Sequence, residues 1–115
     1  MEELLHYVWK HKLFALKPLQ TTDGQPIEII DPGLANMHAG PDFFNAKIKI
    51  NDVTWVGNIE IHQQASDWFR HNHHLDPAYD SVILHVASDI DATPTRSNGE
   101  VIPQMELHYP PYLLK

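Results

Sequence analysis

Apolar residues recur every three or four positions near the start of the chain and alternate with polar residues farther along. The first pattern predicts an amphipathic helix over residues 2–16, which Pro18 ends. Alternating or continuous apolar runs predict strands over residues 26–30, 42–50, 53–62 and 81–86. A short helix over 67–71 precedes the last of these, and residues 101–108 form a further strand, placed at a sheet edge by Pro103.

This order of elements predicts an α/β fold. Three strands with short connections suit an antiparallel meander, and a helix before the fourth strand suits a crossover. We expect a mixed sheet flanked by helices over residues 1–108 as one domain, and a tail or truncated linker over residues 109–115. Phe44 is expected to share the core face with Ile48, and Gly57 indicates a bulge or a close approach of backbone.

Composition narrows the class of protein. The 115 residues suffice for one core, and the absence of cysteine excludes disulfides and thiolate zinc sites. No apolar run is long enough for a membrane span and the start does not resemble a signal peptide, so a cytoplasmic protein is expected. A net charge of −7 argues against nonspecific nucleic-acid binding, although carboxylates that hold a metal are neutralised. Nine histidines are unusually many for this length, and the oligomeric state, including a homo-oligomer, stays open.

Two carboxylates on neighbouring predicted strands form the main candidate site. Asp42 and Glu60 lie in an otherwise apolar hairpin, where an unpartnered carboxylate is costly. Mg²⁺ or Mn²⁺ would be a suitable partner, with the Ile61 carbonyl as a third oxygen ligand. His62 shares a strand face with Glu60 and could accept a proton or donate to a phosphate. The alternative interpretation is that Asp42 caps a loop and that Glu60 and His62 face solvent.

The dipeptide PD at 41–42, followed by EIH at 60–62, resembles the PD-(D/E)XK nuclease signature. The predicted order of elements is similar to the αβββαβ core of that superfamily, which is the restriction-endonuclease-like fold. The resemblance covers roughly residues 2–88, and the element order carries more of it than the short motif does.

This resemblance implies roles for individual residues. Asp42 and Glu60 would bind the metal, and His62 would stand where these nucleases have a catalytic lysine. Some relatives add a glutamate from the first helix, for which Glu3 is the candidate here. Histidine is mostly neutral at neutral pH whereas lysine is charged, so His62 is also compatible with a domain that has lost cleavage.

Longer stretches are similar to the N-terminal part of a bacterial family, domain-of-unknown-function family 2851. They are TTDGQPIEII, GPDFFNAKIKI, GNIEIHQQASDW, HHLDPAYDSVILHV and SNGEVIP. Members are commonly longer than this chain, so the resemblance implies that the remainder of a longer chain is a partner. The family brings no established activity.

A second group of potential ligands follows the short helix, namely His71, His73, His74 and Asp76. Imidazole and carboxylate suit zinc, but the run HNHHLD matches no regular spacing of zinc ligands. His85 interrupts the apolar fourth strand and is expected to be a hydrogen-bonded core residue. If His85 faces Asp42 and Glu60, it would support the ligands or contact substrate, as Asn58 would from its own strand.

The sequence thus predicts a metal-dependent nuclease-like domain that hydrolyses, or once hydrolysed, phosphodiester bonds in DNA. Mg or Mn is the expected cofactor, and Zn is the alternative. A noncatalytic binding or assembly module of a longer protein is the second interpretation, favoured by the negative charge and by His62. The third is a zinc hydrolase that uses histidines and aspartates of residues 62–85.

Overall fold

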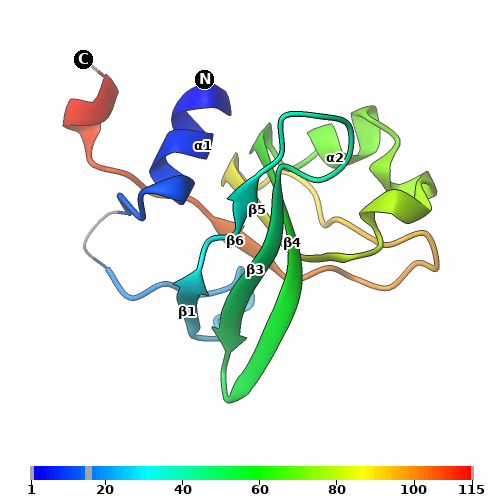
Figure 1. Ribbon diagram of the computed structural model, residues 1–115, viewed down its shortest axis with the longest axis horizontal. Helices are drawn as coiled ribbons and strands as arrows, with labels where there is room; N and C mark the ends of the chain where they lie inside the picture. Colours follow the sequence, from blue (N-terminus) through cyan, green and yellow to red (C-terminus); the bar gives the residue numbers. More distant parts are fainter. Residues whose placement is uncertain (1, 15–16, 115) are drawn as a thin grey trace.

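The described part of the chain, residues 2–14 and 17–114, combines one mixed sheet with short helices in a computed structural model (Figure 1). The strands are β1 Ile27–Asp31, β2 Leu34–Ala35, β3 Phe43–Ile50, β4 Val53–Gln64, β5 Val82–Asp89 and β6 Gln104–Glu106. The helices are α1 Glu2–Lys10 and α2 Asp67–Arg70, with 3-10 turns η1 His73–Leu75, η2 Pro77–Tyr79 and η3 Pro111–Leu114. No helix in this part of the chain is long and apolar enough to cross a membrane.

The sheet has the order β1-β3-β4-β5-β6, and β2 pairs with β3. Strands β1, β3 and β4 run antiparallel, whereas β5 is parallel to β4 and β6 is parallel to β5. The parallel pair requires the chain to cross over between β4 and β5, and α2, η1 and η2 form this connection (Figure 1). The mixed α/β class with a mixed sheet is confirmed, and β2 is an additional strand where an irregular connection was expected.

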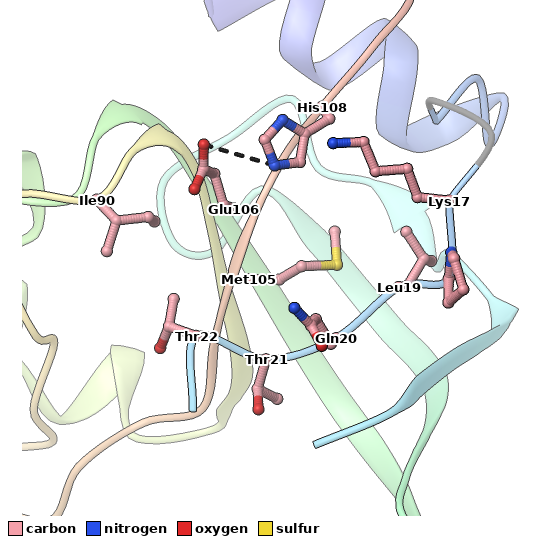
Figure 2. A pocket seen from close by; sticks show the side chains of 10 residues that line it. Lys17, Leu19, Gln20, Thr21, Thr22, Ile90, Met105, Glu106 and His108 are labelled. Carbon is pink, nitrogen blue, oxygen red and sulfur yellow. Dashed lines mark ion pairs between the residues drawn. The ribbon is translucent and has the colours of Figure 1, made fainter. Parts of the chain in front are cut away.

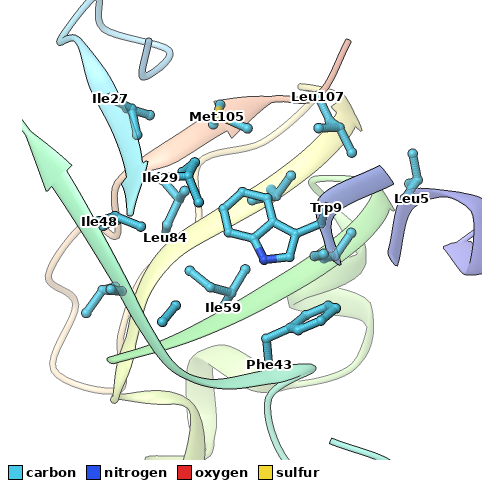
Figure 3. Close-up of a cluster of buried hydrophobic side chains, with 14 of the residues drawn as sticks. Leu5, Trp9, Ile27, Ile29, Phe43, Ile48, Ile59, Leu84, Met105 and Leu107 are labelled. Carbon is cyan, nitrogen blue, oxygen red and sulfur yellow. The ribbon is translucent and has the colours of Figure 1, made fainter. Parts of the chain in front are cut away.

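Helix α1 covers one face of the sheet and closes the main core. Figure 3 shows the Trp9 indole among apolar side chains of the sheet, including Ile59 and Leu84. The indole N–H donates to the Pro32 carbonyl at 2.9 Å, so its polar atom is satisfied. Burying one apolar side chain of this kind contributes about 1.5–3 kcal/mol to the stability of the fold. The many apolar side chains of this core therefore hold α1 against the sheet.

Helix α1 ends earlier than the apolar periodicity predicts. Lys12 has a left-handed backbone (φ 54°), its N–H donates to the Trp9 carbonyl, and the Leu13 N–H donates to the Val8 carbonyl. These two bonds form a Schellman cap, here without the usual glycine. Leu13 still packs against the core, so the periodicity continues past the true end of the helix. Residues 15–16, the last of the predicted helix, lie outside the described part.

A bulge near the start of β3 changes which side chains enter the core. Asn45 has φ 59°, and the β3–β4 register shifts between Phe43 and Ala46. Phe43 is therefore 1% exposed in the main core, whereas Phe44, which the simple alternation placed there, is only half-buried. The extra residue breaks the two-residue period on which the prediction depended.

The segment after β6 returns to the main core. Tyr109 and Leu113 are partly buried against it, and η3 forms within residues 109–115, which were predicted to be a tail. Tyr109 and Leu113 therefore contribute apolar contacts to the folded domain.

Gly57 marks a close approach between β4 and β5, as predicted. A Cβ at this position would lie 2.5 Å from Ile83 Cγ2 and 2.9 Å from the Ser81 carbonyl oxygen. The β4–β5 register also shifts here, because Asn58 pairs with Val82 and the next residue of β4 pairs two positions later in β5. The absence of a side chain at Gly57 thus permits the crossover strand to dock.

Gly57→Ala is expected to lower the free energy of unfolding by about 1–3 kcal/mol, because the added methyl must displace Ile83 or backbone. Urea denaturation would measure the change. Val56→Ala is the matched control: its side chain in the same strand is 65% exposed, so its loss should cost less than about 1 kcal/mol. Equal stability of Gly57→Ala and the wild type would contradict the close approach.

Candidate functional site

The face of β4 opposite the main core carries buried polar side chains. Ile59 and Ile61 belong to the main core, so the alternating Glu60 and His62 lie on the face that α2, η1 and η2 cover. Glu60 is 4% exposed and His62 is 1% exposed. Polar groups buried to this degree require partners, and the surrounding elements supply them.

Asp42 and Glu60 are joined across the start of β3. The Asp42 N–H donates to Glu60 Oε1 at 3.2 Å, and the Ile61 N–H donates to Asp42 Oδ2 at 2.8 Å. Helix α1 adds His6, whose Nε2 lies 3.4 Å from Asp42 Oδ2. The structure thus brings together the three residues that the sequence suggested as oxygen ligands, and places an imidazole beside them.

The two carboxylates differ in their electrostatic surroundings. Burial raises the pKa of Asp42, and the hydrogen bond with His6 offsets this only in part. Burial acts in the same direction on Glu60, but hydrogen bonds from His62 and His73 outweigh it and hold the pKa of Glu60 at about 2. These two imidazoles place Nε2 at 3.2 Å and 3.0 Å from Glu60 Oε2, respectively. Glu60 is therefore ionised and well compensated, whereas His6 compensates Asp42 only in part.

A chain of hydrogen bonds fixes the orientation of the His62 ring. Gln104 Nε2 donates to the Ala92 carbonyl, so Gln104 Oε1 accepts from His85 Nδ1 at 2.7 Å. Burial lowers the pKa of His85 to about 4, so its neutral ring accepts at Nε2 from His62 Nδ1 at 2.8 Å. This pattern assigns a proton to His62 Nδ1 and turns His62 Nε2 toward Glu60. Burial lowers the pKa of His62, but its hydrogen bond with Glu60 prevails and raises it.

The connection after α2 brings two further imidazoles to the same face. Asn72 has φ 59°, and this left-handed residue reverses the chain between His71 and His73. His73 is buried and stacks on Tyr79 with ring centroids 3.7 Å apart, whereas His71 is exposed. One ligand nitrogen from each of His62, His71 and His73 lies within 4.8 Å of the others.

Four other residues suggested by the sequence lie in different surroundings. His74 packs on the Phe69 ring at 4.9 Å, and Asp76 caps η2 by accepting a backbone N–H. Glu3 is exposed on α1, and Asn58 accepts the hydrogen bond that holds the β3 bulge. The turn at η1 therefore separates the predicted zinc cluster, with His71 and His73 directed to β4 and the other two residues elsewhere.

Three residues of the site were not identified from the sequence: His6, Tyr79 and Gln104. His6 reaches the site because α1 packs on the sheet, and Gln104 because β6 pairs in parallel with β5. No regular spacing of residues in the sequence predicts either contact. The one available signal was the polar Gln104 within the apolar run VIPQMEL.

A cavity of about 350 Å³ lies in another part of the fold (Figure 2). It is lined by residues 17–22, by Ile90 just after β5, and by side chains of β6 and of the segment that follows it, among them Met105. Figure 2 shows Glu106 and His108 on its wall, paired at 3.5 Å. None of its lining residues belongs to the cluster around Glu60, so the buried polar groups and this cavity are separate features.

The buried neutral His85 predicts a loss of stability in mild acid. The unfolded chain takes up this proton near the ordinary pKa of 6.5 and the folded chain only near 4, so stability falls as pH drops through this interval. The difference corresponds to about 3 kcal/mol. The raised pKa of His62 has the opposite effect on the pH dependence of stability. The test therefore compares the wild type with a variant that lacks His85.

His85→Gln is expected to show a shallower decline than the wild type between pH 6.5 and pH 4, measured by urea denaturation in the presence of a chelator. His108→Gln is the matched control, because it replaces a half-exposed histidine outside the cluster around Glu60 in the same way. Parallel curves for the wild type and His85→Gln would show that His85 does not titrate in this way.

A comparison with protein-family models gives one match, to a family described as "Protein of unknown function (DUF2851)", over residues 2–115. This confirms the resemblance to domain-of-unknown-function family 2851 that the longer sequence stretches carry. No curated protein and no solved structure matches the chain. The chain, with its buried Glu60 and the histidines around it, belongs to the DUF2851 family.

Proposed function

We propose that this domain is a metal-dependent hydrolase of the nuclease type, which acts on phosphodiester bonds in DNA with Mg²⁺ or Mn²⁺. The observation that carries the proposal is the pair of hydrogen bonds that joins Asp42, Glu60 and the Ile61 backbone. The order α1, strands β1 to β4, α2 and β5, with β5 parallel to β4, supports it as well, although β2 is a strand beyond the αβββαβ pattern.

Asp42, Glu60 and the Ile61 carbonyl would hold the ion. In an extended strand the N–H and C=O of one residue point to the same side, and the Ile61 N–H points to Asp42. The Ile61 carbonyl is therefore expected on that side too. Asp42, whose pKa burial raises, is a carboxylate that a cation would compensate. Such an ion supplies charge neutralisation at a phosphate and lowers the pKa of a bound water.

His62 would replace the lysine of the nuclease signature as a positive charge beside Glu60. A free histidine is mostly neutral at pH 7, but Glu60 raises the pKa of His62 and so favours its charged form. Both of its ring nitrogens have partners, Glu60 and His85, so the ring is held in one orientation. His62 would thus position Glu60, while His6 would be the imidazole beside Asp42.

Asp42→Asn and Glu60→Gln are each expected to reduce nicking of supercoiled plasmid DNA by at least about 100-fold in Mg²⁺ or Mn²⁺. Removal of a metal ligand forfeits several kcal/mol of transition-state stabilisation. Both changes preserve side-chain shape, and circular dichroism would verify folding. The assay measures the rate of conversion from supercoiled to open-circular plasmid.

Asp52→Asn is the matched control, because Asp52 is an exposed carboxylate at the turn of the same hairpin. It should cleave at the wild-type rate. Wild-type nicking that persists in both Asp42→Asn and Glu60→Gln would contradict the proposed site.

A noncatalytic binding or assembly module is a second candidate, supported by a separate observation. The β3–β4 hairpin exposes apolar side chains near its turn, Val53, Trp55 and Val56. Isolated exposed apolar residues are ordinary, but three within four positions suit a binding surface. Wild-type protein that shows no metal-dependent nicking would favour this function.

A further inference from the structure

We propose that His62, His71, His73 and Glu60 form a separate binding site for a divalent cation of the zinc class. This site lies on the Oε2 side of Glu60, whereas Asp42 contacts Oε1. Its ligands come from two elements, β4 and the connection that crosses to β5. It does not depend on the proposed nuclease activity.

Two of the distances between the proposed ligand atoms match those around a tetrahedral ion. Zn–N bonds of about 2.0–2.1 Å place neighbouring ligand atoms about 3.4 Å apart. Glu60 Oε2 lies 3.2 Å from His62 Nε2 and 3.0 Å from His73 Nε2. His71 is within 4.8 Å of the other two imidazoles and is exposed, so a small side-chain movement would complete the set.

The ligand types select the class of ion. Three imidazoles, which are borderline ligands, outnumber the one hard carboxylate, and such a set suits Zn²⁺ and Co²⁺ rather than Mg²⁺. The buried carboxylate of Glu60 requires positive charge beside it, and His62 and His73 both approach its Oε2 atom. A divalent ion would take the place of the protons shared between these groups.

The hydrogen-bond chain behind His62 is of the kind that orients a metal ligand. Through Gln104 and His85, the Ala92 carbonyl fixes the proton on His62 Nδ1 and leaves His62 Nε2 facing Glu60 and His73. Metal-binding histidines commonly donate their second N–H to such a partner. The chain runs through polar side chains of three neighbouring strands, β4, β5 and β6.

Isothermal titration of the chelator-treated full chain with Zn²⁺ should show one site per chain. Co²⁺ should give the intense visible absorption of a tetrahedral complex, and Zn²⁺ should raise the melting temperature. His71→Ala should weaken Zn²⁺ binding at least about 10-fold and abolish the Co²⁺ spectrum. Because His71 is exposed, this variant is expected to fold, and its metal-free melting temperature should equal that of the wild type.

His74→Ala is the matched control, since His74 follows the proposed ligand His73 in the same 3-10 turn but packs on Phe69. It should retain wild-type Zn²⁺ affinity and the Co²⁺ spectrum. The proposal is overturned if the wild type binds no stoichiometric Zn²⁺, or if His71→Ala and His74→Ala bind as the wild type does. Plasmid nicking with Mg²⁺ but no Zn²⁺ binding would remove this site and leave the proposed function, and Zn²⁺ binding without nicking would do the reverse.

Discussion

The buried carboxylate of Glu60 is the group on which the polar half of this fold depends. An ionised carboxylate removed from water is strongly unfavourable unless hydrogen-bonded and compensated by charge. Here both oxygens are occupied, one by the Asp42 amide and the other by His62 and His73. The start of β3, the middle of β4 and the turn η1 are therefore tied to one side chain.

The parallel pairing of β4 and β5 provides the setting for this group. The crossover from β4 to β5 must pass over one face of the sheet, and it does so with short turns rather than a long helix. These short turns leave space over the sheet for side chains, which here include the stacked rings of His73 and Tyr79. Helix α1 and its Trp9 cover the other face with apolar contacts. One face of the sheet therefore carries the main apolar core, and the other carries the buried polar groups around Glu60.

The sequence predicted most elements correctly, and its errors have local causes. The helix end was misplaced because Lys12 adopts a left-handed cap without glycine, and the core residue of β3 because Asn45 forms a bulge. Asp42, Glu60 and Ile61 could be found together because strand alternation and a short hairpin turn fix their relation. His6 and Gln104 could not, because they are distant in sequence and their contacts depend on how α1 and β6 pack.

The sequence alone determined the α/β class, the positions of most strands along the chain and the face that Glu60 shares with His62. These follow from apolar periodicity, which is a local property of the chain. Only the tertiary structure decided that His71 and His73 meet His62 while His74 turns away, and that His85 and Gln104 fix the His62 ring. The physical reason is that a left-handed turn at Asn72 and two parallel strand pairings set these distances, and neither has a repeating signature in sequence.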